Sequence, residues 1–281
     1  MNSLKTWILM GLLTVVLVMI GQFVGGPRGM FIFLLLSIAM NAIGYWTSGS
    51  MAIAMTGSYP VSESELPEVY QIVRRLANRA ALPMPEVYVT PSPQPNAFAT
   101  GRNPNHAKVA VTEGILRTLS ARELEGVLAH EMAHVRNHDI LISSMAATLA
   151  GVITSIANIL QWGMFFGFGQ RDERDGNAFA EIAMMILAPI AATVIQLAIS
   201  RSREYKADAV GAKLLGDPNP LADALERLES ASQHIPSGVN PATSHLFIVN
   251  PLRGESVLQL FSTHPPMAER IRRLRSMRIL N

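Results

Sequence analysis

SARELEGVLAHEMAHVRNHD, residues 120–139, is the stretch around which the rest of this chain is organised. Its first serine and Glu123 have the spacing of a capping box, so a helix is predicted to begin there. On that helix His130 and His134 lie one turn apart on the same face, where both imidazoles can bind one Zn²⁺. Glu131 points aside and is left free to act as a general base. The HExxH pattern therefore predicts a zinc site with its own catalytic glutamate.

The same pattern can arise by chance in a helix with ordinary surface residues, and for this composition the expectation is about one in a hundred. The motif therefore needs a third ligand as support. An extended pattern with a histidine six residues after the second histidine is absent, because that position holds Ile140. His138 continues the same face, but one helix cannot wrap three successive turns around one tetrahedral ion. The third ligand must come from elsewhere in the chain.

RSREYKADAV, residues 201–210, offers the best candidate. Glu204 and Asp208 stand four residues apart on a predicted helix, so both carboxylates face the same place. Glu204 can bind the metal, while Asp208 can accept the remaining ring N–H of a ligating histidine and fix its tautomer. The alternative is a solvated helix whose charged side chains pair with one another: Arg201, Arg203, Glu204 and Lys206.

Four motifs occur in order along the chain: PNAFATG, HEMAHVRNHD, SREYKAD and STHPP. In these motifs, and over nearly its whole length, the chain resembles the HtpX-type membrane zinc metalloproteases, relatives of the eukaryotic CAAX prenyl endoproteases. The resemblance implies that His130, His134 and Glu204 bind zinc and that Glu131 is the catalytic base. It further implies a stress-response hydrolase that cleaves membrane proteins in quality control.

The composition is richer in apolar residues than a soluble protein of this size needs, since 281 residues are 49% hydrophobic and only 16% charged. The excess is expected to lie in lipid. The chain has no cysteine, so disulfides and thiolate ligands are excluded and zinc must be held by histidine and carboxylate. A net charge of +2, without an alternation of aromatic and basic residues, argues against a nucleic-acid partner.

Two pairs of uncharged stretches predict two transmembrane hairpins. Residues 7–24 and 30–46, joined by GGPRG, form the first, within a domain of residues 1–50. A cleaved signal peptide is the alternative for its first stretch, although no small-residue cleavage site follows. Residues 141–169 and 182–200 form the second, within residues 141–200, although the polar residues in it would also suit helices buried partly in protein.

The remaining segments, residues 51–140 and 201–281, are predicted to form the two parts of one protease domain. A helix is expected from the capping pair Ser62 and Glu65. Three short strands, residues 86–90, 96–100 and 107–112, are expected to form a β-meander. The fold class is therefore a mainly α membrane protein, with four transmembrane helices in two hairpins and a zincin-like α+β metalloprotease domain.

The strand that begins with Asn96, Ala97 and Phe98 is a candidate for substrate binding. In the family that the chain resembles, an edge strand with this sequence borders the cleft and holds extended substrate. Such an edge offers unpaired backbone groups, which suits the binding of unfolded segments irrespective of sequence.

Further catalytic candidates lie near the C-terminus and beside the third ligand. The resemblance places His264 and Arg270 near the zinc, where a preorganised donor would stabilise the oxyanion of the transition state. His264 is the first candidate, and Tyr205 is held in reserve. A capping or packing histidine, and an arginine on the surface, are the alternatives.

The expected location is multi-pass in a bacterial inner membrane, with the active site facing the cytoplasm. Basic residues crowd just after the last predicted span, whereas residues 171–175 carry only two, so the positive-inside rule places the site in the cytoplasm. Residues 102–106 and 252–255 should then be cytoplasmic and residues 171–175 outside. The predicted function is a zinc endopeptidase with one Zn²⁺ per chain, embedded in the lipid bilayer and acting at its cytoplasmic face on misfolded or unassembled membrane proteins or unfolded polypeptides. A non-catalytic scaffold or holdase, or a channel with an incidental HExxH, is the alternative, and the intact Glu131 argues against both.

Overall fold

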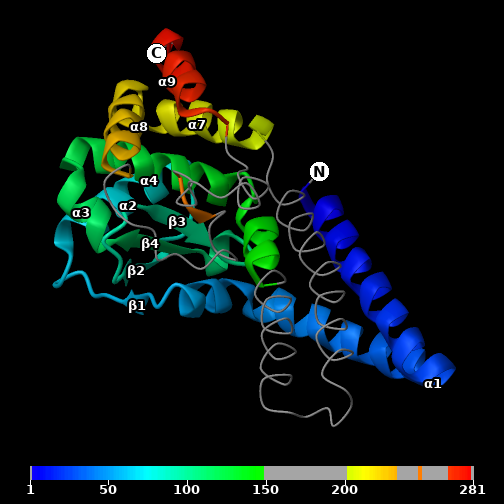
Figure 1. The fold of residues 1–281 in the computed structure, drawn as a ribbon. Coiled ribbons are helices and arrows are strands. Elements are labelled where there is room, and N and C mark those ends of the chain that lie inside the picture. Colours follow the sequence, from blue (N-terminus) through cyan, green and yellow to red (C-terminus); the bar gives the residue numbers. More distant parts are fainter. Residues whose placement is uncertain (1, 149–200, 233–245, 249–264, 280–281) are drawn as a thin grey trace, which may run out of the picture.

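A computed structural model describes residues 2–148, 201–232, 246–248 and 265–279 (Figure 1). The second predicted hairpin from residue 149 onward, and His264, lie outside the described residues.

The N-terminal segment, α1 (Asn2–Met55), consists of two helices that meet at Gly25 and Gly26. Gly26 has φ 60° and ψ −146°, a conformation essentially restricted to glycine. The two arms pack against each other, since the Asn41 side-chain amide donates to the Met10 carbonyl (3.2 Å) and to the Thr14 hydroxyl (3.0 Å). The N-terminal segment is therefore a helical hairpin, while the crossing of the membrane by both arms stays a prediction.

Among the described residues, one helix is long and apolar enough to cross a membrane, namely the second arm of α1, Gly25–Met55. The first arm contains a shorter apolar helix, Thr6–Met19. A helix of the second arm's 31 residues is about 46 Å long, which exceeds the roughly 30 Å of the hydrocarbon layer. The end of this arm accordingly packs on the sheet, where Ala52 and Ile53 share a buried cluster with Phe98.

The sheet has four strands, β1 (Tyr59–Pro60), β2 (Glu86–Thr90), β3 (Ala97–Thr100) and β4 (Lys108–Thr112), in the order β1-β2-β4-β3. β2 and β4 are parallel, while the other two pairs are antiparallel. The predicted meander is therefore wrong, because β2 pairs with β4 instead of β3. The connection PSPQP carries three prolines and does not form a tight hairpin turn, whereas Gly101 (φ 136°) reverses the chain between β3 and β4.

Side chains alternate between the two faces of the sheet, and both faces are covered. Val87, Val109 and Val111 face the main helical core, whereas Tyr88, Phe98 and Ala110 pack toward the end of α1. These short strands are consequently buried on both sides, and β3 lies at the edge of the sheet that adjoins α4.

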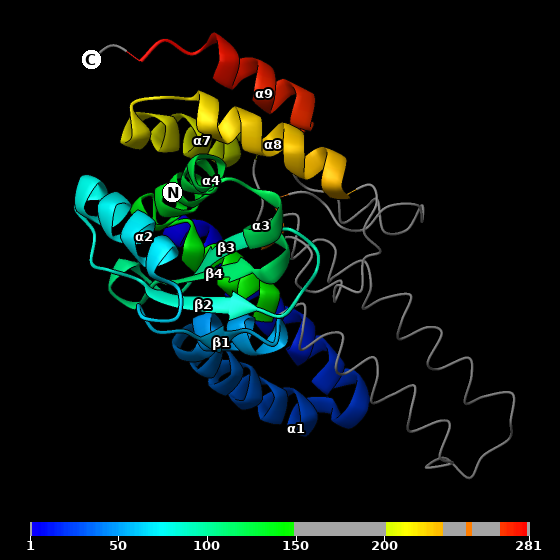
Figure 2. The same ribbon diagram turned by 90° about the vertical axis from the view of Figure 1, so that its left-hand side faces the viewer.

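Helices cover the sheet in layers, with α4 between the sheet and the pair α7 and α8, and with α9 outermost (Figures 1 and 2). These helices are α2 (Pro67–Ala80), α3 (Glu113–Thr118), α4 (Ala121–Arg136), α7 (Arg201–Leu215), α8 (Asn219–Ser232) and α9 (Met267–Ser276), and residues 140–148 are helical as well.

The start of α4 is as predicted, because Ser120 and Glu123 form both hydrogen bonds of a capping box. The start of α2 differs from the prediction. Ser62 and Glu65 do bond to each other, but they form a separate turn, and the helix begins later at Pro67, whose ring suits the first helical position.

Candidate metal centre

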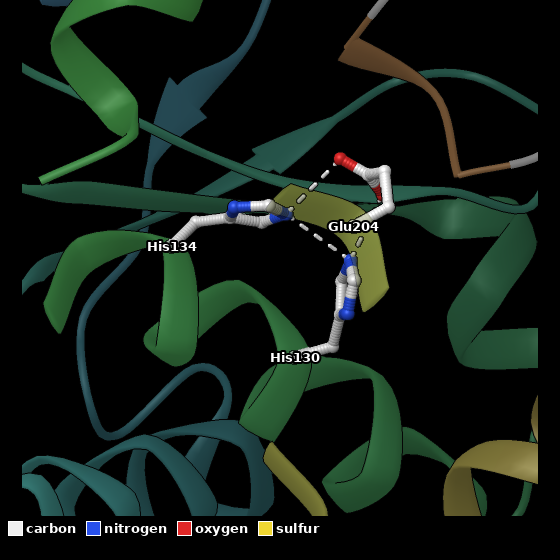
Figure 3. Close-up of side chains that lie close together, drawn as sticks. All are labelled: His130, His134 and Glu204. Atoms are coloured by element: carbon white, nitrogen blue, oxygen red, sulfur yellow. Dashed lines mark hydrogen bonds and ion pairs between the residues drawn. The ribbon is translucent and has the colours of Figure 1, made fainter. Parts of the chain in front are cut away.

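The helix α4 carries its HExxH residues into the interior of the protein. His130 and Glu131 are 2% and 6% exposed, and α7 crosses α4 directly above them. Gly211 allows this crossing, since a Cβ at that position would lie 3.0 Å from the backbone of Ala129 and His130. The close approach brings Glu204, at the start of α7, beside the two imidazoles (Figure 3).

The ligand atoms of three residues converge, with one Glu204 oxygen nearest each imidazole. The Nε2 atoms of His130 and His134 are 3.2 Å apart, and the Glu204 carboxylate oxygens lie 3.6 Å from the first and 3.5 Å from the second. Ligands at about 2.0–2.1 Å from a tetrahedral ion are separated by about 3.3 Å. The spacing therefore fits a metal ion held by two nitrogens and one oxygen, as the sequence predicts for these three residues.

The outer nitrogen of His130 is bound to Asp208, the residue predicted for this position. Nδ1 lies 2.9 Å from Oδ1 of Asp208. Arg270 in turn donates two hydrogen bonds to that carboxylate, of 2.7 and 3.0 Å, and is fully buried. Burial opposes protonation of His130, but its bonds to Asp208 and Glu204 prevail and raise its pKa to about 9. The charge of Arg270 and the bond from His130 outweigh burial and lower the pKa of Asp208.

The outer nitrogen of His134 has a carboxylate partner as well. Nδ1 of His134 lies 3.1 Å from Oδ2 of Asp139, a residue that the sequence did not single out. Asp139 is 3% exposed. Both Nδ1 atoms thus face acceptors, which leaves the two Nε2 lone pairs pointing at each other and at a carboxylate. Such a cluster of acceptors favours a bound cation.

Glu131 lies at the edge of β3 that faces away from β4. Its Oε2 accepts the Ala99 N–H at 3.0 Å. Burial raises the pKa of this carboxyl, against the opposing charges of His130 and His134. A carboxyl with a raised pKa beside the metal group is suited to accept a proton from water.

The remaining predicted residues that the structure describes are the three at the start of β3 and Tyr205. Asn96 is buried and its side chain binds the backbone of Leu246 and Ile248, while Ala97 and Phe98 lie in the two cores. The ring of Tyr205 lies 3.8 Å beneath the Arg273 guanidinium.

Two imidazoles from one helix and a carboxylate from another, beside a buried glutamate at a strand edge, define a metallopeptidase centre of the HExxH class. The chain belongs to Peptidase family M48, which it matches over residues 63–278. With its apolar N-terminal helix, it is a membrane metalloprotease.

Proteins named "Protease HtpX homolog" are similar over nearly the whole chain. The one from Pelotomaculum thermopropionicum is 58% identical and covers 99% of this chain and 100% of its own, and that from Syntrophobacter fumaroxidans is 53% identical, covering 98% and 99%. Among solved structures, the crystal structure of S. mikatae Ste24p aligns with a TM-score of 0.45 and 22% identity, over 96% of this chain and 67% of that one.

Proposed function

We propose that this metalloprotease is a zinc endopeptidase that hydrolyses peptide bonds of misfolded or unassembled membrane proteins at the cytoplasmic face of a bacterial inner membrane. The observation that carries the proposal is the convergence of His130, His134 and Glu204 beside Glu131. Zinc is favoured because the donor set is two imidazoles and one carboxylate at tetrahedral spacing.

Glu131 acts as the general base and acid in this proposal. Zinc, when bound, would polarise the scissile carbonyl and lower the pKa of a water toward about 7. The Glu131 carboxylate takes a proton from the attacking water and passes it to the leaving amine. The Ala99 N–H holds one oxygen of this carboxylate at 3.0 Å, which fixes the orientation of the other.

The backbone of β3 is the proposed substrate platform. Asn96 and Thr112 form a hydrogen-bonded pair across β3 and β4, so the alternation of an antiparallel ladder turns the N–H and C=O groups of Ala97 and Ala99 away from β4. The Ala99 N–H reaches Glu131 on that side. A peptide that paired with the outward N–H and C=O of Ala97 and with the Ala99 C=O would lie beside the metal group, and its recognition by backbone would tolerate many sequences.

Two groups near the metal have proposed roles in the transition state. Arg270 is held against Asp208 with one guanidinium nitrogen 3.5 Å from the His130 ring, so its positive charge lies within the centre. His264 lies outside the described residues and stays the sequence-based candidate for an oxyanion donor, with Tyr205 in reserve.

We also propose that the metal centre lies close to the membrane surface. Trp46, in the second arm of α1, is 63% exposed, and the Arg102 guanidinium stacks 4.5 Å above its ring. Tryptophan and arginine are both favoured at the boundary between lipid and water. Gly49, three residues after Trp46, packs closely against Gly101 at the end of β3. Substrate segments at the membrane surface would therefore lie near β3.

The decisive experiment compares Glu131→Gln with wild type in zinc content and in cleavage of an unfolded membrane protein. The amide keeps the shape of the carboxylate but accepts no proton, so zinc should stay while cleavage falls by about 100-fold or more. Glu125→Gln, on the same helix but on its partly exposed side, where Glu125 pairs with Arg75, is the control and should cleave normally. Wild-type cleavage by Glu131→Gln would remove this residue from the mechanism, and zinc without cleavage in wild type would favour the scaffold or holdase.

A further inference from the structure

Asp139 reaches the metal centre from just beyond the end of α4. The helix stops at Arg136, and His138 adopts a left-handed conformation with φ 58°. The His138 N–H then bonds to the Val135 carbonyl, and the Asp139 N–H bonds back to the His134 carbonyl at 2.9 Å. These two bonds are those of a Schellman motif, with histidine in the place usually held by glycine.

This turn has a chemical consequence for His134. It folds the Asp139 side chain back along the helix end, where Oδ2 lies 3.1 Å from the ring Nδ1. Since Nε2 faces the His130 ring and Glu204, the proton of a neutral His134 belongs on Nδ1, and Asp139 is its acceptor. Without an acceptor there, the ring could flip or carry its proton on Nε2, and it would then not bind metal.

The start of a helix and an arginine both lie close to the Asp139 carboxylate. Asp139 directly precedes the helical residues 140–148, and the start of a helix favours a carboxylate. Arg203, the neighbour of Glu204, interacts electrostatically with Asp139, and burial lowers the pKa of this guanidinium. The position of Asp139 behind His134 parallels that of Asp208 behind His130, where Arg270 forms an ion pair with the carboxylate.

We propose that the Asp139 carboxylate is the positioning residue of His134, so that each metal-binding imidazole has its own carboxylate. This inference rests on the proposed metal centre. A carboxylate behind a ligating histidine fixes the tautomer and raises the basicity of the ring, and its loss costs about 10 to 100-fold in metal affinity.

The test measures the Zn²⁺ dissociation constant of the full chain in detergent, by competition with a chelator, and the visible absorption of the Co²⁺-substituted protein. Asp139→Asn is the informative variant, because asparagine starts a helix as well as aspartate but lacks the charge. We expect about 10-fold weaker Zn²⁺ binding in Asp139→Asn, about 100-fold in Asp139→Ala, and a shifted Co²⁺ spectrum in both. Glu125→Gln is the control for loss of an acidic residue near the same helix, and should match wild type in both measurements.

Wild-type affinity and an unchanged Co²⁺ spectrum in Asp139→Asn would overturn the proposal, and this variant decides the matter even if Asp139→Ala does not fold. His134→Ala separates the inference from the proposed metal centre. If His134→Ala loses Zn²⁺ while Asp139→Asn keeps wild-type affinity, only the role of Asp139 fails. If His134→Ala itself binds Zn²⁺ like wild type, the proposed centre fails as well.

Discussion

At the scale of single residues, a proton and a metal ion compete for His130. Its pKa of about 9 lies above the ordinary value of 6.5 because Asp208 and Glu204 accept hydrogen bonds from it, against the opposing effect of burial. A protonated imidazole cannot bind a metal ion. The same carboxylates that orient the ligand therefore make the binding of metal depend on pH.

We predict that the apparent affinity for Zn²⁺ falls as the pH decreases below about 9, by about tenfold for each pH unit, since one proton must leave His130 before metal binds. Asp208→Asn removes the negative charge that raises this pKa, so its affinity should change less between about pH 7 and pH 8. Chelator competition over a series of buffers measures both. A wild-type affinity that stays constant over this range would contradict the prediction.

The sequence predicted Asp208 but missed Asp139, and the reason is geometric. Asp208 lies four residues after Glu204 on the same helix, so helical periodicity alone places the two carboxylates together. Asp139 lies beyond the end of α4 and reaches His134 only because His138 takes a left-handed conformation. Glycine at that position would have signalled the turn, but histidine does not.

At the scale of elements, the metal centre depends on how closely α4 is packed against α7 and α8. Gly126 faces α8, and a Cβ at that position would lie 2.5 Å from the Leu221 backbone nitrogen and 2.6 Å from the Pro220 carbonyl carbon. Real Cβ atoms do not come so close to backbone, so the two helices would have to separate.

We predict that Gly126→Ala lowers the free energy of unfolding by about 1–3 kcal/mol, because overpacking outweighs the gain in helix propensity from alanine. Thermal unfolding in detergent measures the loss. Gly44→Ala is the matched control, since the atom nearest to a Cβ added at Gly44 would be a Met145 methyl, at the ordinary distance of 3.7 Å. Equal melting temperatures for Gly126→Ala and Gly44→Ala would refute the close approach of α4 and α8.

Local signals explain which elements were predicted correctly. The capping box at Ser120 is complete within four residues, so the start of α4 could be placed from sequence. The order of the strands has no such signal, because the pairing of β2 with β4 depends on the path of the proline-rich connection over the sheet. The extent of β3 was nevertheless predicted to within one residue.

At the scale of the whole molecule, the second arm of α1 connects the apolar hairpin to the sheet beside the metal centre. Arg28 lies just after the break between the two arms, and Trp46 lies near the other end of the second arm. Arg102 stacks on Trp46, which fixes the turn at residues 104–106 beside that end. If the second arm crosses the bilayer, Arg28 and this turn must be exposed on opposite sides.

We predict that a membrane-impermeant maleimide labels Arg28→Cys and Asn105→Cys from opposite sides of the membrane, with Asn105→Cys labelled from the cytoplasm. The chain has no native cysteine, so each variant carries one reactive thiol. Arg272→Cys is the control on the protease domain, since the Arg272 side chain is 76% exposed, and it should be labelled from the same side as Asn105→Cys. Labelling of Arg28→Cys and Asn105→Cys from one side would mean that the second arm of α1 does not cross the bilayer. Labelling of Asn105→Cys and Arg272→Cys from outside would keep the crossing but reverse the proposed orientation, because the basic residues after the last predicted span would then lie on the wrong side.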